Sequence, residues 1–216
     1  MNKEELFSKI EKAIVEGNRQ ESVRWAQEAV KAKLDLNEVI EKGYSAGIQK
    51  VGDLWEKGEY FLPELITSAE CMKAAMAVLQ PELEKAKIEI TSLGKVVIGT
   101  IEGDIHDIGK NLVASMLSAN GFDVIDLGAD VKLEKFIERA EAERADLICL
   151  SALLTTTMMG QRKLIEMLRT KNLLGRFKVM VGGAPVNQKW ADGIGADGYA
   201  ENAMTAVTAA KNLLKR

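Results

Sequence analysis

The spacing of apolar residues divides the chain into two parts with different periods. In residues 1–88 apolar residues recur every three or four positions, which predicts amphipathic helices. Four such stripes are present: Leu6–Ile14, Val23–Leu34, Leu36–Leu54 and Leu65–Leu79. The pair Asp35 and Glu38 before the third stripe is typical of a capping box, and Pro63 fits the first turn of the fourth helix. We therefore predict a bundle of four short helices.

From about residue 95 short apolar runs alternate with helical stretches. Continuous apolar runs are typical of strands buried on both faces, and their alternation with helices predicts a parallel sheet. The predicted strands are Val96–Ile101, Val124–Leu127, Leu147–Ser151, Val179–Val181 and Asp197–Ala200. The predicted helices are Ile108–Asn120, Leu133–Glu143, Met158–Lys171, Asn187–Gly193 and Asn202–Leu214. This pattern indicates a Rossmann-like, flavodoxin-type fold with a doubly wound sheet of five parallel strands.

The change of period predicts two domains, a helical domain over residues 1–89 and an α/β domain over residues 90–216. Ile88–Gly94 is the predicted linker between them. The net charge of −3 lacks the basic balance that nucleic-acid binding needs. We find neither a signal peptide nor an apolar run long enough to cross a bilayer, so we expect a cytoplasmic protein without a membrane partner. Cys71 and Cys149 fall in predicted core segments, which favours free buried thiols over a disulfide.

The chain contains one histidine, His106, in the sequence Gly103-Asp-Ile-His-Asp-Ile-Gly109. A predicted strand precedes it and a predicted helix follows, and open α/β sheets bind their ligands at such turns. A metal-bound imidazole usually donates its other ring N–H to a carboxylate, and Asp104 and Asp107 stand nearby. We interpret His106 as a candidate metal ligand, with a solvated surface histidine as the alternative. One histidine and two scattered cysteines do not make a protein-built zinc site, so any metal must arrive with its other ligands in place.

Small and hydroxylated residues also follow the third, fourth and fifth predicted strands. Glycines at such positions allow a ligand to approach the backbone, and hydroxyls can donate to a polar ligand. The residues concerned are Ser151, Thr155, Thr156 and Thr157 after the third strand, Gly182, Gly183 and Ala184 after the fourth, and Gly198, Tyr199 and Ala200 after the fifth. Each alone is explained by turn chemistry, but their shared place on one rim favours a single large ligand. The phosphate-binding glycine patterns are absent after the first strand, which argues against a dinucleotide or a nucleoside triphosphate.

The motif around His106 resembles the Asp-x-His-x-x-Gly signature of cobalamin-binding domains. Two further blocks are similar to those of the same family: Ser151-Ala-Leu-Leu-Thr155 resembles its Ser-x-Leu block, and Val181-Gly-Gly-Ala184 its Gly-Gly block. The helical first part resembles the helical cap of methionine synthase and of the small corrinoid proteins of methyltransferase systems. Asp53–Pro63 is similar to the cap motif of that subgroup. The resemblance covers almost the whole chain.

The resemblance implies a binding site for cobalamin, used in its cob(I)alamin and methylcob(III)alamin forms. It implies that His106 replaces the cofactor's own lower base as the axial ligand of cobalt, with Asp104 holding the other ring nitrogen. Thr157 stands where the family's relay has a serine, so the hydroxyl is kept. Trp55 stands where methionine synthase has a phenylalanine and is equally well explained as a core residue of the bundle. The resemblance places Ser151, Thr155, Gly182 and Gly183 beside the nucleotide tail, and Glu41, Trp55 and Leu62 over the upper face. The other residues that it places at the cofactor are Gly103, Asp104, Ile105, His106, Asp107, Gly109, Leu153, Thr157 and Ala184.

The resemblance further implies a methyl carrier and not an enzyme. Such a carrier works with a substrate:corrinoid methyltransferase, a second methyltransferase of the tetrahydrofolate or coenzyme M type, and a reductive activase. Two alternatives stay open. The first is a cobalamin subunit of a radical isomerase, although such subunits generally lack the helical cap. The second is a cobalamin-dependent sensor, although such sensors carry an added DNA-binding segment that we do not find here. A flavodoxin-like domain without a cofactor is the remaining alternative.

Overall fold

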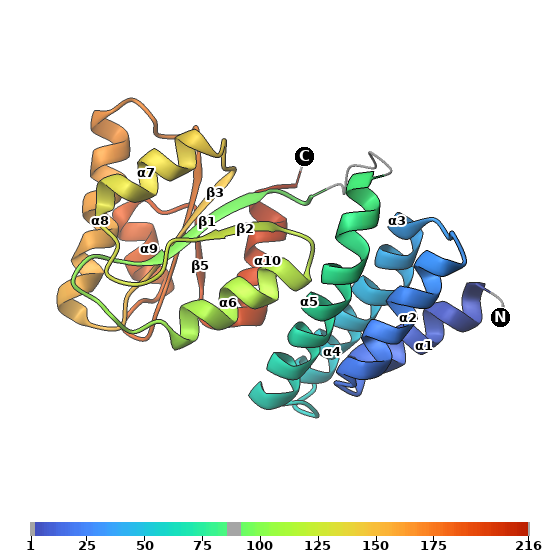
Figure 1. The fold of residues 1–216 in the computed structure, drawn as a ribbon. Helices are drawn as coiled ribbons and strands as arrows, with labels where there is room; N and C mark the ends of the chain where they lie inside the picture. Colours follow the sequence, from blue (N-terminus) through green and yellow to red (C-terminus); the bar gives the residue numbers. More distant parts are fainter. Residues whose placement is uncertain (1–2, 86–91, 216) are drawn as a thin grey trace. The chain divides into compact units, whose positions relative to one another are not determined.

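The computed structural model describes residues 3–85 and 92–215. The chain forms two compact units, which Figure 1 shows in the colours of the sequence. The helical unit comprises Met1–Thr91 with Ala119–Gly121, and the α/β unit comprises Ser92–Ser118 with Phe122–Arg216. The predicted boundary between residues 89 and 90 and most of the predicted linker lie outside the described residues. None of the described helices is both long and apolar enough to cross a membrane.

The helical unit follows the four predicted stripes. Its elements are α1 (Lys3–Val15), α2 (Arg19–Lys31), α3 (Leu36–Val39), η1 (Ile40–Ser45), α4 (Ala46–Glu56) and α5 (Leu62–Lys85). The third predicted helix is therefore one continuous helical segment in which η1 is a turn of π-helix. The apolar spacing did not predict this turn, because the buried residues of η1, Gly43 and Tyr44, fit the spacing of an ordinary amphipathic helix.

Two glycines permit the close packing of α1 against this third helical segment. A Cβ atom on Gly43 would lie 2.9 Å from Cγ2 of Ile10, and one on Gly47 would lie 2.8 Å from Cβ of Ile14. Tyr44, the residue after Gly43, is fully buried, and its hydroxyl donates a hydrogen bond to the carbonyl oxygen of Ser22 at 2.7 Å. The two helices approach more closely than any side chain at these glycines would allow.

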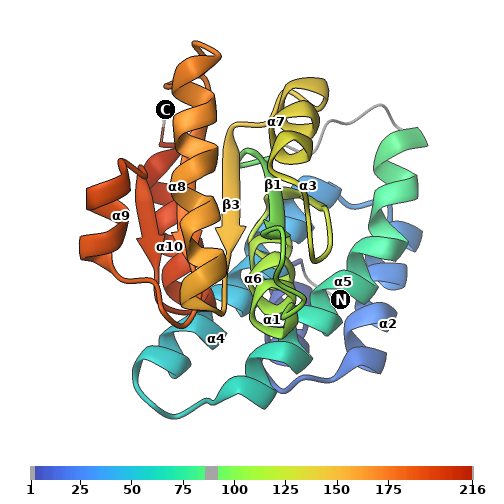
Figure 2. The ribbon, with the colours of Figure 1, turned by 90° about the vertical axis from the view of Figure 1, so that its left-hand side faces the viewer.

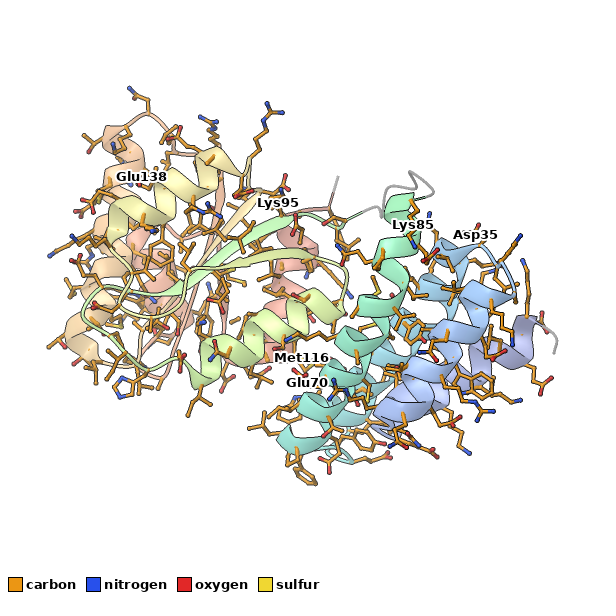
Figure 3. All side chains as sticks on the ribbon, in the orientation of Figure 1. Asp35, Glu70, Lys85, Lys95, Met116 and Glu138 are labelled. Carbon is orange, nitrogen blue, oxygen red and sulfur yellow. The ribbon has the colours of Figure 1, made fainter. Side chains whose placement is uncertain are left out.

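The fourth helix differs from the predicted short one, because α5 continues through Pro81 to Lys85. Pro81 cannot donate a backbone hydrogen bond, yet Leu79 and Leu83 are both buried on either side of it. Packing on both sides of the proline outweighs its local cost. The predicted capping box is also only half formed. Asp35, labelled in Figure 3, accepts hydrogen bonds from the start of α3, whereas the Glu38 carboxylate pairs with Lys3 and Lys42.

The α/β unit is a parallel sheet of five strands, as predicted, and the strand order is β2-β1-β3-β4-β5. The strands are β1 (Lys95–Thr100), β2 (Asp123–Asp126), β3 (Leu147–Ser151), β4 (Lys178–Gly182) and β5 (Gly198–Ala200). The helices are α6 (Ile108–Ala119), α7 (Leu133–Ala142), α8 (Thr155–Thr170), α9 (Gln188–Ile194) and α10 (Ala203–Leu213). The largest difference from the prediction is α8, which begins three residues before Met158. Its polar first turn hides the start of the helix from an analysis based on apolar spacing.

Helices cover both faces of the sheet in this unit. Figures 1 and 2 show α7, α8 and α9 on one face, and Figure 1 shows α6 and α10 on the other. The core under α7 contains Phe136, fully buried, against Val97 and Ile148 of the central strands. Cys149 is buried in β3 and Cys71 in α5, and both are free thiols, as predicted.

The register of the strands aligns their carboxyl ends on one edge of the sheet. Thr100 at the end of β1 pairs with Ser151, Ser151 with Gly182, and Gly182 with Ala200. β1 and β3 are neighbours although β2 lies between them in sequence, so their following loops meet at the point where the strand order reverses. Lys95, labelled in Figure 3, lies at the opposite end of β1 and pairs there with Asp123 at 3.3 Å.

Candidate functional site

Asp104 is the centre of the polar contacts at the carboxyl edge of the sheet. It is fully buried in the loop after β1. Its Oδ1 atom contacts Nδ1 of His106 at 2.7 Å and accepts the His106 backbone N–H at 3.1 Å. Its Oδ2 atom accepts the backbone N–H of Leu153 at 2.7 Å and the hydroxyl of Thr157 at 2.8 Å. The carboxylate therefore ties the loop after β1 to the loop after β3 and the first turn of α8.

These hydrogen bonds keep Asp104 ionised. Burial alone would raise the pKa of its carboxyl, but the hydrogen bonds from the backbone of Leu153 and His106 and from the Thr157 hydroxyl outweigh burial, and the pKa lies well below its usual range. An ionised carboxylate can only accept, so Nδ1 of His106 must carry the proton of this contact.

The proton on Nδ1 leaves Nε2 of a neutral His106 with the free lone pair. The His106 side chain is 49% exposed, and its carboxylate partner is buried. A ring held through Nδ1 with Nε2 available is the arrangement of a histidine metal ligand. This outcome supports the candidate role of His106 over the alternative of a solvated surface histidine.

The backbone around His106 is held by further local contacts. Gly103 has a φ of 82°, which lets the chain turn sharply after β1. The Thr100 hydroxyl donates to the His106 carbonyl at 3.1 Å. Asp107, the other carboxylate beside the histidine, does not hold the ring but accepts a hydrogen bond from the Asn111 side chain at 3.0 Å. Of the two carboxylates that the sequence offered, the structure selects Asp104.

The other predicted rim residues line the same edge of the sheet. Gly183 has a φ of 119°, and a Cβ atom there would lie 1.8 Å from the carbonyl oxygen of Ala152. Only glycine fits this position, because the loop after β4 runs against the backbone of the loop after β3. Gly182 lies next to Ser151 in the register, and Ala184 and Thr155 are exposed. In contrast, a Cβ atom on Gly109 would meet no atom within 4 Å, so the fold itself does not require glycine there.

Large apolar side chains are exposed around Gly103–Gly109, the segment that contains His106 and that we call the histidine turn. Ile105 is 76% and Ile108 is 85% exposed, on either side of His106, and Leu153 and Leu154 are each more than 40% exposed. Exposed apolar residues grouped at one edge mark a surface that a partner or a ligand covers. Together with the free Nε2 atom, they fit a large, flat, mostly apolar ligand that carries a metal.

The predicted residues of the helical unit present a different surface. Glu41 lies in the π-helical turn η1, Trp55 is half-buried near the end of α4, and Leu62 is the first residue of α5. Leu62 is 43% exposed, and Phe61 and Ile66 beside it are exposed as well. The turn of π-helix at Glu41 is noteworthy because such turns occur frequently at functional sites.

Sequence reasoning missed the residues that follow β2. It considered the ends of the other four strands and left out the end of β2, where Asp126 pairs with Lys110 and the Asp130 carboxylate accepts the backbone N–H of Gly103. The signal was present, because the second predicted strand contains Asp126 and is followed directly by Gly128-Ala-Asp130. Gln161 was missed too, and its buried amide donates to the carbonyls of Leu150 and Gly182.

Comparison with known proteins decides the family. Residues 94–208 match the family described as "B12 binding domain", and residues 6–80 match a second family with the same description. The chain belongs to the B12-binding corrinoid proteins. It is 51% identical over 213 residues to trimethylamine corrinoid protein 2 of Methanosarcina acetivorans, covering 99% of this chain and 98% of that protein. It is 49% identical to dimethylamine corrinoid protein 2 of the same organism, with the same coverage.

Solved structures agree with this assignment. The crystal structure of the methanol:cobalamin methyltransferase complex MtaBC from Methanosarcina barkeri contains a chain that is 33% identical, with a TM-score of 0.87. The match covers 99% of this corrinoid protein and 81% of that chain. The resemblance inferred from the motifs, the predicted fold class and the predicted cofactor, cobalamin, are therefore confirmed.

The described residues fit cobalamin. The free Nε2 of His106 is the type of nitrogen that binds cobalt, and the exposed isoleucines suit the apolar face of a corrin ring. The tight backbone contact at Gly183 keeps that part of the rim free of side chains. Within the described residues no group of three or more His, Cys, Asp or Glu side chains that could hold a metal ion is present.

Proposed function

We propose that this corrinoid protein is a methyl carrier that binds cobalamin in the base-off, His-on state, with His106 as the lower axial ligand. The observation that carries the proposal is the contact of 2.7 Å between Nδ1 of His106 and the buried carboxylate of Asp104. It fixes the ring and leaves Nε2 as the ligating atom. The residues of the rim, from Ser151 and Thr155 to Gly183, are proposed to accommodate the displaced nucleotide tail.

Bound cobalamin supplies the cobalt atom that accepts a methyl group and releases it again. The chain's own residues have three tasks. His106 presents one nitrogen in a fixed direction. Asp104 keeps the proton of the imidazole on Nδ1, because its carboxylate stays ionised, and Thr157 adds a hydrogen bond that holds the carboxylate. Trp55, Leu62 and Glu41 are proposed to cover the upper, methyl-bearing face.

We propose that the carrier works between two methyltransferases and needs a reductive activase. The relatives named for trimethylamine and dimethylamine are almost equally similar to this chain, so a methylated amine is the donor class to test first. The more distant methanol:cobalamin methyltransferase complex supports a substrate methyltransferase as the docking partner. These relatives favour a carrier over a radical isomerase subunit or a light sensor.

The axial ligand can be tested with one label. Because His106 is the chain's only histidine, protein grown with ¹⁵N-histidine carries the isotope in a single imidazole. Electron paramagnetic resonance of the cobalt(II) form is expected to show a nitrogen hyperfine pattern that changes from ¹⁴N to ¹⁵N with the label. A pattern that ignores the label, and follows instead the nitrogen of the cofactor's own base, would contradict the proposal.

The carrier role is tested by methylation with and without a partner. The isolated, reduced holoprotein is expected to accept methyl from methyl iodide, whereas methylamines require the matching methyltransferase. With that enzyme, the rate is expected to saturate in this protein as it does in a substrate. Rapid methylation from a methylamine by this chain alone would show that it is an enzyme and not a carrier.

A further inference from the structure

The loop that joins β2 to α7 contacts the histidine turn on its strand side. Oδ1 of Asp130 accepts the backbone N–H of Gly103 at 2.7 Å, and the backbone N–H of Asp130 donates to the carbonyl of Asp104 at 2.9 Å. Asp130 has a φ of 54°, a left-handed conformation that residues other than glycine adopt uncommonly. With this backbone conformation, the side chain of Asp130 contacts Gly103 and its backbone N–H contacts Asp104, the next residue of the turn.

The end of β2 contacts the same turn on its helix side. Lys110, in the first turn of α6, has a side chain that is only 1% exposed, and Nζ lies 2.6 Å from Oδ1 of Asp126 and 2.5 Å from Oδ2. A positive charge near the amino end of a helix opposes the helix dipole, and a buried charge is costly unless it is paired. The stability of α6 does not explain a lysine at this position, whereas an anchor to β2 does.

The contacts before His106 and those after it are connected through Gly128 and Thr100. Oδ1 of Asp126 accepts the N–H of Gly128 at 2.9 Å, and the carbonyl of Gly128 accepts the N–H of Thr100 at 2.9 Å. The Thr100 hydroxyl then donates to the carbonyl of His106 at 3.1 Å. A chain of contacts therefore runs from the helix after His106, through the end of β2, back to the histidine itself.

We propose that Asp126 and Asp130, together with Lys110, are positioning residues that hold the Asp104–His106 pair in its ligating geometry. The inference deepens the proposed function and rests on His106 as the axial ligand. No described hydrogen bond or ion pair joins these three side chains to the imidazole. They act on the backbone of Gly103 and Asp104 before the histidine and on α6 after it, so the ring stays aligned before the cofactor arrives.

The test uses pairs of variants in the full-length, untagged protein. Asp130→Asn keeps an acceptor for Gly103, whereas Asp130→Gly removes it, and both residues tolerate the left-handed backbone. Asn172→Gly is the matched control for the backbone change, because Asn172 has a φ of 56° in the loop before β4. Lys110→Met removes the buried cation. Lys178→Met is its control, because Lys178 pairs with Asp197 at the opposite edge of the sheet.

The first measurement is made without the cofactor. The imidazole ¹⁵N spectrum reports the tautomer of the only histidine, and we expect the Nδ1–H form in the wild type, Asp130→Asn and both controls. In Asp130→Gly and Lys110→Met we expect the two ring-nitrogen shifts to move toward each other as the second tautomer becomes populated. Unchanged shifts in both variants would overturn the proposal.

The second measurement is the affinity for cobalamin. Losing a direct partner of a ligating histidine costs about 10–100-fold, so a loss about threefold to tenfold is expected one contact further away. Asp130→Asn is expected to retain affinity, and an Asp130→Gly or Lys110→Met protein that binds as tightly as its control would overturn the positioning role. Absence of a His106 hyperfine signal in the loaded wild type overturns the axial ligand instead, so the two failures are distinct.

Discussion

Asp104 in the α/β unit is buried and accepts hydrogen bonds from two loops, whereas Leu62 in the helical unit is apolar and 43% exposed. Both residues are proposed to serve the same cofactor. Hydrogen bonds are directional, and they fix an imidazole that must point at one atom. Apolar contacts are not directional, so a surface such as Leu62 and its neighbours can be covered and uncovered without losing a specific partner. Under the proposed function, the comparison predicts that the histidine is held in advance by directional hydrogen bonds, whereas the surface around Leu62 makes apolar contacts that can be released.

Replacing the ligand itself should have the largest effect. We expect His106→Ala to lower cobalamin affinity by more than the about 10–100-fold typical for loss of a partner of the ligand, because the axial nitrogen is gone. The apoprotein should lose only about 1–2 kcal/mol of unfolding free energy, because the buried Asp104 carboxylate loses the ring N–H but keeps the backbone N–H of residue 106. Equilibrium dialysis and urea unfolding measure the two quantities. If the loss of unfolding free energy equals the loss of binding free energy, His106 serves the fold and not the cofactor.

Replacing the carboxylate behind the ligand comes next. Asp104→Asn should lower cobalamin affinity about 10–100-fold, because an amide no longer keeps the proton on Nδ1. The Thr157→Ser variant, which keeps the hydroxyl and introduces the serine of the family pattern, is the control and should bind as the wild type does. If Asp104→Asn matches that control in affinity, the axial side is not fixed by this contact.

Two glycines of the rim separate what the fold requires from what the ligand requires. Gly183→Ala should destabilise the apoprotein by about 3 kcal/mol or more, because its Cβ would overlap the Ala152 carbonyl at a positive φ. Gly109→Ala, in the first turn of α6, should stabilise it by about 0.5–1 kcal/mol, since no atom lies near its Cβ. Denaturant unfolding measures both. A loss of cobalamin affinity in Gly109→Ala, despite its higher stability, would mean that ligand binding and not the fold requires glycine at this position.

The upper side should respond more weakly. Leu62→Ser should change the unfolding free energy by no more than about 0.5 kcal/mol, because the side chain is exposed. It should accelerate photolysis of the methyl-loaded holoprotein, since the methyl group is then less enclosed. Phe61→Ser, one residue earlier and 64% exposed, is the matched control. Equal photolysis rates in Leu62→Ser and the wild type would mean that Leu62 does not cover the cofactor.

The smallest expected effect is on acid stability. The pKa of Asp104 is lowered in the folded protein, while its unfolded value is about 3.9. Its ionised form therefore stabilises the fold fully above about pH 4, and this contribution is lost as the pH falls from there toward the folded pKa. Urea unfolding of the apoprotein between about pH 2.5 and 6 should show a steeper acid loss in the wild type than in Asp104→Asn. Parallel curves would mean that the carboxylate is not held in its ionised state.

Much of the architecture could be predicted because its signals are local. Apolar runs and turn residues placed β3 at Leu147–Ser151 without error, and the ends of the other strands to within a residue or so. The spacing left Asp104 and Asp107 open as partners of His106, and the contact that the family resemblance implied, with Asp104, is present. The turn of π-helix at Ile40–Ser45 and the passage of α5 through Pro81 were not, because packing of the finished bundle outweighs local preference there.

The sequence by itself determined most of the elements, the family resemblance and the single histidine. Only the tertiary structure decided which groups complete the site. The contacts of Asp104 with Leu153 and Thr157 join residues about fifty positions apart, and the ion pair of Lys110 with Asp126 joins the first turn of α6 to the end of β2. Such contacts follow from strand order and register, which depend on packing across the whole sheet and leave no pattern within any single segment.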